Sequence, residues 1–226
     1  MSQQLKYTVD IVLCIDGTGS MKSHIERVKQ NALKFHNDLN ENLSTKGKTI
    51  DYLRVKVIVF RDFYSDGINA FLQSPFYSLP SDNYDFFEFV NTIQAFGGGD
   101  DPESGLEALA VAIKSPWNKA GNKLRQVIVV WTDEEAHELE RASRYNISNY
   151  PKDIPKNFNE LTDLWENGID ISSNGKRLII FAPEKQPWKD MVKFWELSLL
   201  YPSIAGKGLQ DFEYNAIIDA IANSVG

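Results

Sequence analysis

Short runs of consecutive apolar residues alternate along this chain with longer segments in which apolar residues recur every three or four positions. The runs are rich in β-branched side chains and end at turn-forming residues, which is typical of strands covered on both faces. They predict four buried strands, Val9–Ile15, Leu53–Phe60, Gln126–Trp131 and Arg177–Phe181. A weaker strand is expected around Asn69–Phe76 as an antiparallel edge after the Asp66-Gly67 turn, and a further short one near Ser203–Ala205.

Amphipathic segments with helical spacing lie between these strands. They predict helices over Met21–Leu39, Asn83–Ile93, Pro102–Lys114, Phe158–Trp165, Trp188–Leu200 and Phe212–Ser224. Such alternation predicts an α/β fold: a doubly wound, mainly parallel six-stranded sheet flanked by helices, with one antiparallel edge strand. One domain over residues 1–226 accounts for the whole pattern, and residues 134–157, which have no clear period, are expected to form a loop.

Composition and charge exclude some classes of binding partner. The 226 residues carry a formal net charge of −7, which argues against nucleic acid or an anionic membrane surface as the main partner. No apolar stretch approaches the length of a membrane span, and the first residues lack the pattern of a signal peptide. Cys14 is the only cysteine, so no internal disulfide forms. We therefore expect a cytoplasmic protein.

Polar residues gather where ligands of open α/β sheets bind, outside the carboxyl ends of the strands. Three segments stand out, Asp16–Ser20 after the first strand, residues 97–104 before a helix, and residues 132–137 after the strand that ends at Trp131. The first of these alternates Asp16, Thr18 and Ser20 with glycines, which let the backbone turn so that the three side chains converge. Carboxylate and hydroxyl oxygens suit a hard cation such as Mg²⁺ or Mn²⁺.

The three segments resemble one known family. Asp16-x-Thr18-x-Ser20 resembles the D-x-S/T-x-S signature of von Willebrand factor A domains, which forms the first loop of their metal-ion-dependent adhesion site. The stretch from Asp100 to Gly105 resembles the D-x-P-E-G-G motif of integrin β I-like domains and is also similar to intracellular A-domains, including bacterial ones and those attached to atypical kinases. Thr132-Asp133, with a histidine behind it, resembles the third loop of the family.

The resemblance implies a ligand set for one divalent cation. It assigns Asp16, Thr18 and Ser20 from the first loop, Glu103 from the second and Asp133 from the third, with Asp100 serving a neighbouring cation. The expected ion is Mg²⁺, with Mn²⁺ or Ca²⁺ as alternatives. Where integrin β domains carry residues for flanking cations, this chain has Ser23, His24 and Gly98, so a single metal is the expected count.

Each of these residues also has a plainer interpretation. Asp16 alone would serve as a helix cap, and the run from Asp133 would be a solvated loop. Asp101 is expected in solvent, His137 to pack the loop or lie behind the metal ligands, and Cys14 to be a small buried side chain. His24 and His36 are expected on helix surfaces, and Trp131, Trp165, Trp188 and Trp195 in the core.

Two functions from different classes compete. The resemblance implies a non-enzymatic scaffold or adaptor, in which the Asp or Glu of a partner protein completes the coordination of the bound Mg²⁺; an ATPase, kinase or phosphatase of the same system is the expected kind of partner. Alternatively, Cys14–Thr18 resembles the D-x-D-G-T motif of haloacid-dehalogenase-type phosphatases, which transfer phosphoryl groups with Mg²⁺. The nucleophilic Asp of that motif falls on Cys14, which cannot form an aspartyl-phosphate. A nucleotide-binding glycine loop is disfavoured because Gly17 and Gly19 are not followed by the later glycine of a dinucleotide-binding fingerprint.

Overall fold

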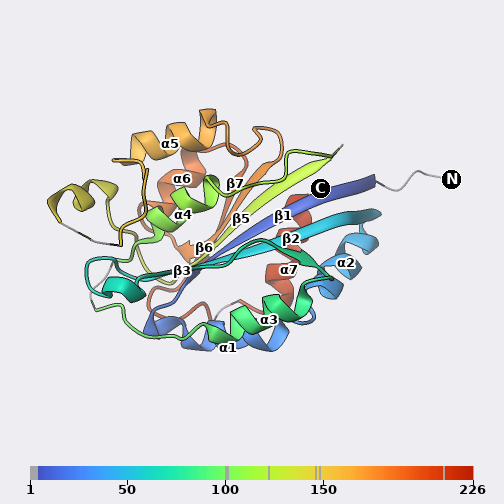
Figure 1. Ribbon diagram of the computed structural model, residues 1–226, viewed down its shortest axis with the longest axis horizontal. Coiled ribbons are helices and arrows are strands. Elements are labelled where there is room, and N and C mark those ends of the chain that lie inside the picture. The colour runs from blue at the N-terminus through green and yellow to red at the C-terminus, as the bar shows by residue number, and fades with distance from the viewer. Residues whose placement is uncertain are drawn as a thin grey trace.

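The fold, given by a computed structural model, is a sheet covered by helices on both faces (Figure 1). The structure describes residues 5–99, 102–121, 123–145, 147, 149–210 and 212–225. In this part of the chain the sheet has seven strands in the order β3-β2-β1-β5-β6-β7, with β4 also paired to β2. This confirms the predicted doubly wound, mainly parallel fold. The strands are β1 (Leu5–Asp16), β2 (Lys48–Phe60), β3 (Phe71–Gln73), β4 (Tyr77–Leu79), β5 (Leu124–Trp131), β6 (Lys176–Pro183) and β7 (Ser198–Ser203).

The parallel strands end together at one edge of the sheet. β1 lies between β2 and β5, with Asp16 opposite Phe60 on one side and Ile15 opposite Trp131 on the other. The residues that follow these strands are therefore brought side by side at the carboxyl edge, although the ends of β1 and β5 lie more than a hundred positions apart in the sequence. The strand order thus gathers these loops at the carboxyl edge of the sheet, where ligand-binding sites of open α/β folds lie.

The antiparallel edge consists of two short strands, β3 and β4, where the sequence predicts one. Both pair with β2, and the break between them falls at Ser74–Phe76. Pro75 cannot donate a backbone hydrogen bond to the ladder, while Ser74 pairs with Val57 through both its backbone N–H and its side-chain oxygen. The sheet consequently has seven strands instead of the expected six.

Two hydrophobic cores lie on opposite faces of the sheet, as the helix layers in Figure 1 show. One core packs beneath α1 (Lys22–Asn31), α2 (Phe35–Thr45), α3 (Asn83–Thr92) and α7 (Tyr214–Val225). The other packs beneath α4 (Gly105–Ile113), α5 (Phe158–Asn167) and α6 (Trp188–Phe194). Full burial of one large apolar side chain stabilises the fold by about 1.5–3 kcal/mol. The four tryptophans predicted for the core are at most 3% exposed.

The helices predicted over Met21–Leu39 and Trp188–Leu200 differ from those in the structure. The predicted Met21–Leu39 helix is divided into α1 and α2, because the N–H groups of Ala32 and Lys34 each donate to the carbonyl three residues earlier and interrupt the α-helix. The apolar spacing continues across this break because both helices cover the same core. The Trp188–Leu200 prediction was wrong beyond Phe194. There the backbone of Leu197 turns with φ of 60°, and Ser198–Ser203 joins β6 as the parallel edge strand β7.

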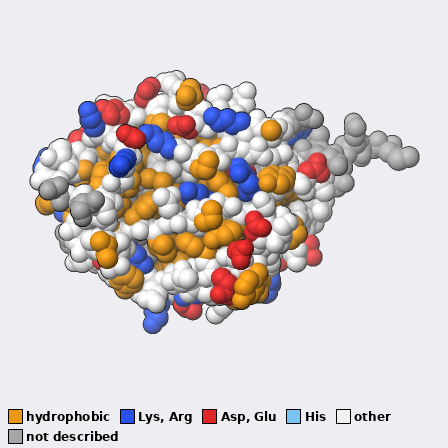
Figure 2. Space-filling view, viewed as in Figure 1, with side chains coloured by type: hydrophobic (Ala, Val, Ile, Leu, Met, Phe, Trp, Pro, Cys, Tyr) orange, Lys and Arg blue, Asp and Glu red, His pale blue; other side chains and the backbone are white. Residues whose placement is uncertain are grey.

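The segment predicted as a loop, residues 134–157, contains the short 3-10 helix η3 (Leu139–Arg144). Among the residues that the structure describes, no helix is both long enough and apolar enough to cross a bilayer. Charged side chains of both signs are interspersed with hydrophobic ones on the face seen in Figure 2.

Candidate metal site

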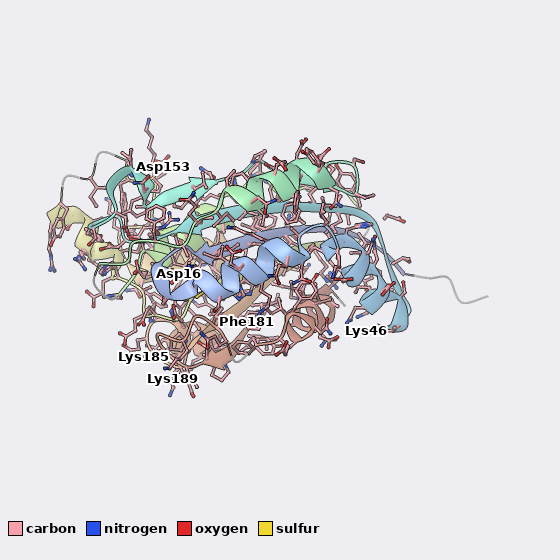
Figure 3. All side chains as sticks on the ribbon, turned by 90° about the horizontal axis from the view of Figure 1, so that it is seen from below. Asp16, Lys46, Asp153, Phe181, Lys185 and Lys189 are labelled. Atoms are coloured by element: carbon pink, nitrogen blue, oxygen red, sulfur yellow. The ribbon has the colours of Figure 1, made fainter. Side chains whose placement is uncertain are left out.

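The side chains predicted to bind a metal lie at the carboxyl edge of the sheet. Asp16 is the last residue of β1, and Thr18 and Ser20 follow it into the short 3-10 helix η1 (Gly19–Met21). Asp133 comes two residues after β5, and Glu103 two residues before α4. Figure 3 shows Asp16 and Lys185 toward one end of the molecule, with Lys46 toward the other.

Four side-chain oxygens from the first and third loops form a continuous series. Thr18 Oγ1 donates to Asp16 Oδ1 at 2.6 Å and lies 3.3 Å from Ser20 Oγ. Ser20 Oγ in turn donates to Asp133 Oδ1 at 2.9 Å. The structure therefore brings together four of the predicted ligands from segments 113 residues apart in sequence.

The Asp16 carboxylate is fully buried and hydrogen-bonded on both oxygens. Besides Thr18, it accepts from Thr132 Oγ1, which lies 2.7 Å from Asp16 Oδ2. Burial raises the pKa of Asp16 to about 6; the hydrogen bonds from Thr18 and Thr132 lower this pKa, and nearby Asp133 raises it further. Two carboxylates held this close inside the protein favour a compensating cation.

Asp133 is held from the opposite side by the chain beyond β7. The backbone N–H of Gly208 donates to Asp133 Oδ2 at 2.7 Å, and that of Gly206 donates to the Asp133 carbonyl at 2.9 Å. Its side chain is completely buried. Asp133 therefore has one oxygen fixed by the backbone and the other turned toward Ser20.

Glu103 is positioned by a short parallel bridge to the third loop. Its N–H donates to the Glu135 carbonyl at 3.0 Å, and its carbonyl accepts from the N–H of His137 at 2.8 Å. Its carboxylate approaches the first loop across Gly98: a Cβ added at Gly98 would lie 2.8 Å from Glu103 Oε1 and 2.9 Å from Thr18 Cβ. The backbone of Gly98 has φ of 75°, which favours glycine.

The oxygen spacing fits a small octahedral cation. With metal–oxygen bonds of 2.0–2.1 Å, adjacent ligands of Mg²⁺ lie about 2.9 Å apart. The three oxygen–oxygen distances, 2.6, 3.3 and 2.9 Å, scatter around this value, which is also close to the ordinary separation of hydrogen-bonded oxygens. Within the described ranges, no three His, Cys, Asp or Glu side chains form a group that could hold a metal ion by themselves.

Arg61, directly after β2, organises the loops around this site and was not among the residues predicted from sequence. Its guanidinium donates to four backbone carbonyls, those of Gly17, Phe96, Asn69 and Gln94, at 2.6–3.0 Å, and stacks on the Phe96 ring at 3.9 Å. The sequence signal that could have indicated this role of Arg61 is a charged residue directly after a buried strand. Thr132 was visible in the third motif, but its bond to Asp16 was not anticipated.

Other sequence predictions at the site have mixed outcomes. Asp100 and Asp101 lie outside the described residues. His137 is buried behind the second loop, with Nε2 3.2 Å from Asp62 Oδ1, as expected for a loop-packing histidine. The prediction for His24 was wrong: it is completely buried, because this side of α1 faces Trp131 on the sheet. Cys14 is buried as predicted.

Comparisons with known proteins agree with this architecture. The family model of the von Willebrand factor A domain matches residues 10–147. The alpha-protein kinase vwkA of Dictyostelium discoideum is 29% identical over 168 residues, which are 74% of this chain and 24% of the kinase.

Two crystal structures of the pilus adhesin SpaC from Lactobacillus rhamnosus GG, one of them in the open conformation, share the fold, with TM-scores of 0.57 and 0.53 and 14% identity. Each alignment covers 99% of this chain but only 31% and 30% of the adhesin. The chain thus spans less than a third of these relatives. Because the family match covers more than half of its residues, the chain belongs to the von Willebrand factor A domain family.

Proposed function

We propose that this domain is a divalent-metal-dependent protein-binding module, in which a carboxylate of the partner completes the coordination of a bound Mg²⁺. The observation that supports it most is the continuous series of oxygens from Asp16, Thr18, Ser20 and Asp133. The series is buried at Asp16 and exposed at Ser20, so one side of the site faces solvent.

Each residue has a distinct part in this proposal. The hydroxyls of Thr18 and Ser20 bind the ion without adding charge, and the carboxylates of Asp16, Glu103 and Asp133 neutralise it directly or through water. When bound, the ion supplies an electrophilic centre that attracts an anionic group. Because most of the carboxylates are also engaged by protein donors, the ion keeps affinity for an incoming carboxylate.

The partner is proposed to be a protein that presents an Asp or Glu. Two exposed apolar side chains lie near the site: Phe96, 39% exposed, whose N–H donates to the Gly17 carbonyl of the first loop, and Ile68, 81% exposed. Ile68 follows Gly67, whose carbonyl accepts a hydrogen bond from Asn149 in the segment 134–157. One relative of this chain is an alpha-protein kinase, so we propose that a kinase, ATPase or phosphatase of the same system is the partner class.

We propose that the domain itself is not an enzyme. In the alternative phosphatase hypothesis, the position of the nucleophile is occupied by Cys14, whose side chain is fully buried in the core beneath α4 and whose Sγ lies 3.8 Å from the Ala108 carbonyl. Burial raises the pKa of the Cys14 thiol far above its ordinary value, which opposes formation of the nucleophilic thiolate.

Calorimetric titration of the chelator-stripped protein with Mg²⁺ and Mn²⁺ tests the metal dependence. We expect one equivalent of metal to bind the wild type, and binding to be lost in Asp16→Ala and strongly reduced in Glu103→Ala. Asp85→Asn, which removes an exposed carboxylate on α3, is the matched control and is expected to bind like the wild type. Equal binding in the wild type and Asp16→Ala would refute the assignment.

A further inference from the structure

The two edges of the sheet differ in length. One edge consists of β3 and β4, which have three residues each. The other edge is the six-residue strand β7, which pairs with β6 and, among the residues that the structure describes, with no further strand. Very short edge strands are one means by which proteins avoid pairing with other chains, and β7 does not have this protection.

The β7 edge also lacks the charged side chains that usually prevent pairing between chains. Residues 197–206 carry no charged side chain. Leu199, in the middle of this segment, is 53% exposed, and Phe194, Leu197 and Ile204 are 41–63% exposed. These four are among twelve exposed large hydrophobic side chains in the described residues. Exposed apolar surface is therefore concentrated in and around β7.

The backbone of β7 presents a defined set of hydrogen-bonding groups to the outside. The N–H of Leu178, the register partner of Ser198, donates to the Leu197 carbonyl at 2.9 Å. Because successive residues of a strand point to opposite sides, the odd-numbered residues of β7 face β6. The N–H and carbonyl groups of Ser198 and Leu200, and the carbonyl of Pro202, therefore point outward. Within the described part of the chain these outward groups make no hydrogen bond.

Pro202 determines which partner strand fits this edge. Proline has no N–H, so the edge donates only from Ser198 and Leu200. In an antiparallel pair related by a two-fold axis, Ser198 can lie opposite Leu200 of a second copy, and each such pair exchanges both hydrogen bonds. Pairing Leu200 with Leu200 of the second copy would instead place Pro202 opposite Ser198, where one donor is missing. We propose that the chain forms a dimer by antiparallel pairing of β7 with β7 of a second copy, with Ser198 opposite Leu200.

The side chains of β7 agree with self-pairing in this register. Leu199 lies opposite Leu199 of the second copy in a pair without hydrogen bonds, where side chains approach most closely. A charged residue near the two-fold axis would face a like charge, and the uncharged segment 197–206 avoids this repulsion although each chain carries a net charge of −7.

The available surface predicts a weak dimer. Half of the surface of four large apolar side chains is on the order of 400 Å² per copy, below the roughly 800 Å² of a standard interface. The dimer is therefore expected to dissociate on dilution. Because the pairing is antiparallel, the carboxyl edges of the two sheets lie at opposite ends of the dimer. Neither candidate metal site is covered, so the dimer is expected equally with Mg²⁺ and with a chelator.

Analytical ultracentrifugation of the full chain, at concentrations up to about 1 mM, tests the dimer. The wild type is expected to dimerise reversibly. Leu199→Lys places two lysines opposite each other and is expected to raise the dissociation constant of the dimer at least about tenfold. Leu72→Lys, at a 39% exposed position of the opposite edge strand β3, is the matched control and is expected to dimerise like the wild type.

Two results of this experiment overturn the proposal. One is a wild type that stays monomeric at every concentration, which would leave the edge to a strand of another protein. The other is equal dimerisation of the wild type and Leu199→Lys. Because metal binding by the monomer needs no contact with β7, neither result bears on the proposed function.

Disulfide cross-linking tests the register independently. Directly opposite residues without hydrogen bonds have Cα atoms about 4.5 Å apart, which is within the range of a disulfide. Leu199→Cys is therefore expected to form a covalent dimer under a mild oxidant, whereas the native Cys14 is buried and does not take part. Ile204→Cys, at a similarly exposed position, has no cysteine opposite it and is the control. Cross-linking of Ile204→Cys as fast as Leu199→Cys, or none of Leu199→Cys, overturns the register.

Discussion

Glu107 provides a quantitative test of the packing beneath the second loop. It lies in the first turn of α4, completely buried, and its Oε1 accepts from the hydroxyl of Tyr150 at 2.9 Å. Burial, the largest influence, raises the pKa of Glu107 to about 7; hydrogen bonds to its own backbone and from Tyr150 lower it, and Asp62 raises it. The folded protein therefore keeps this carboxyl protonated at a pH where the unfolded chain ionises it.

The sign and size of the effect follow from these two pKa values. An acid whose pKa rises from 4.5 to about 7 on folding destabilises the fold progressively as the pH rises between those values. At 1.36 kcal/mol per unit, this group lowers the free energy of unfolding by about 2.5 kcal/mol between pH 5 and pH 8. Glu107→Gln keeps an acceptor for Tyr150 and does not titrate, so it removes this loss.

Urea unfolding at pH 5 and pH 8, followed by tryptophan fluorescence, measures the difference. We expect Glu107→Gln to gain about 2.5 kcal/mol relative to the wild type on going from pH 5 to pH 8, by linkage. Glu41→Gln, an exposed position on α2, is the matched control and is expected to show no such gain. A stability difference between Glu107→Gln and the wild type that is the same at both pH values would refute the burial argument.

Three further outcomes are expected. His24 has its pKa lowered from 6.5 to about 3 on folding, so stability falls as the pH drops below 6.5; chemical denaturation should show that His24→Leu removes about 2 kcal/mol of the loss between pH 7.5 and pH 5. Gly98→Ala is expected to weaken Mg²⁺ binding at least about tenfold in calorimetry, because the added Cβ would displace the Glu103 side chain. Gly47→Ala is the control, since Gly47 has a similar φ of 68° but open space around it. This control should lower the free energy of unfolding by only about 1 kcal/mol through backbone strain and leave Mg²⁺ binding unchanged. Arg61→Met should lower the free energy of unfolding by about 3 kcal/mol, measured in urea, because it strands buried carbonyls; equal stability would contradict its role.

Local patterns predicted the parallel sheet and most of the candidate site. The strands are continuous apolar runs, and Asp16, Thr18 and Ser20 lie within five residues of each other, so both features are readable from short segments. Asp133 was predicted because it follows a strand, and the shared carboxyl edge of parallel strands then brings it to Ser20. That these residues hold a metal remains a prediction.

The features that the sequence did not reveal depend on long-range contacts. The burial of His24 depends on which side of α1 faces Trp131, and a histidine beside an apolar stripe resembles a surface residue. Leu199 and Leu200 fit a helical period but belong to an edge strand, because pairing with β6 decides their conformation. Arg61 donates its hydrogen bonds to backbone carbonyls, and such acceptors cannot be recognised from the side chains in the sequence.

The most direct test of the central claim is to locate the ion. In crystals of the protein grown with Mn²⁺, an anomalous difference map should show one peak within bonding distance of Thr18 Oγ1 and Ser20 Oγ, and the peak should be missing in Asp16→Ala. A peak at another position would contradict the metal-dependent mechanism. The absence of a peak at these hydroxyls in crystals saturated with Mn²⁺ would contradict it equally.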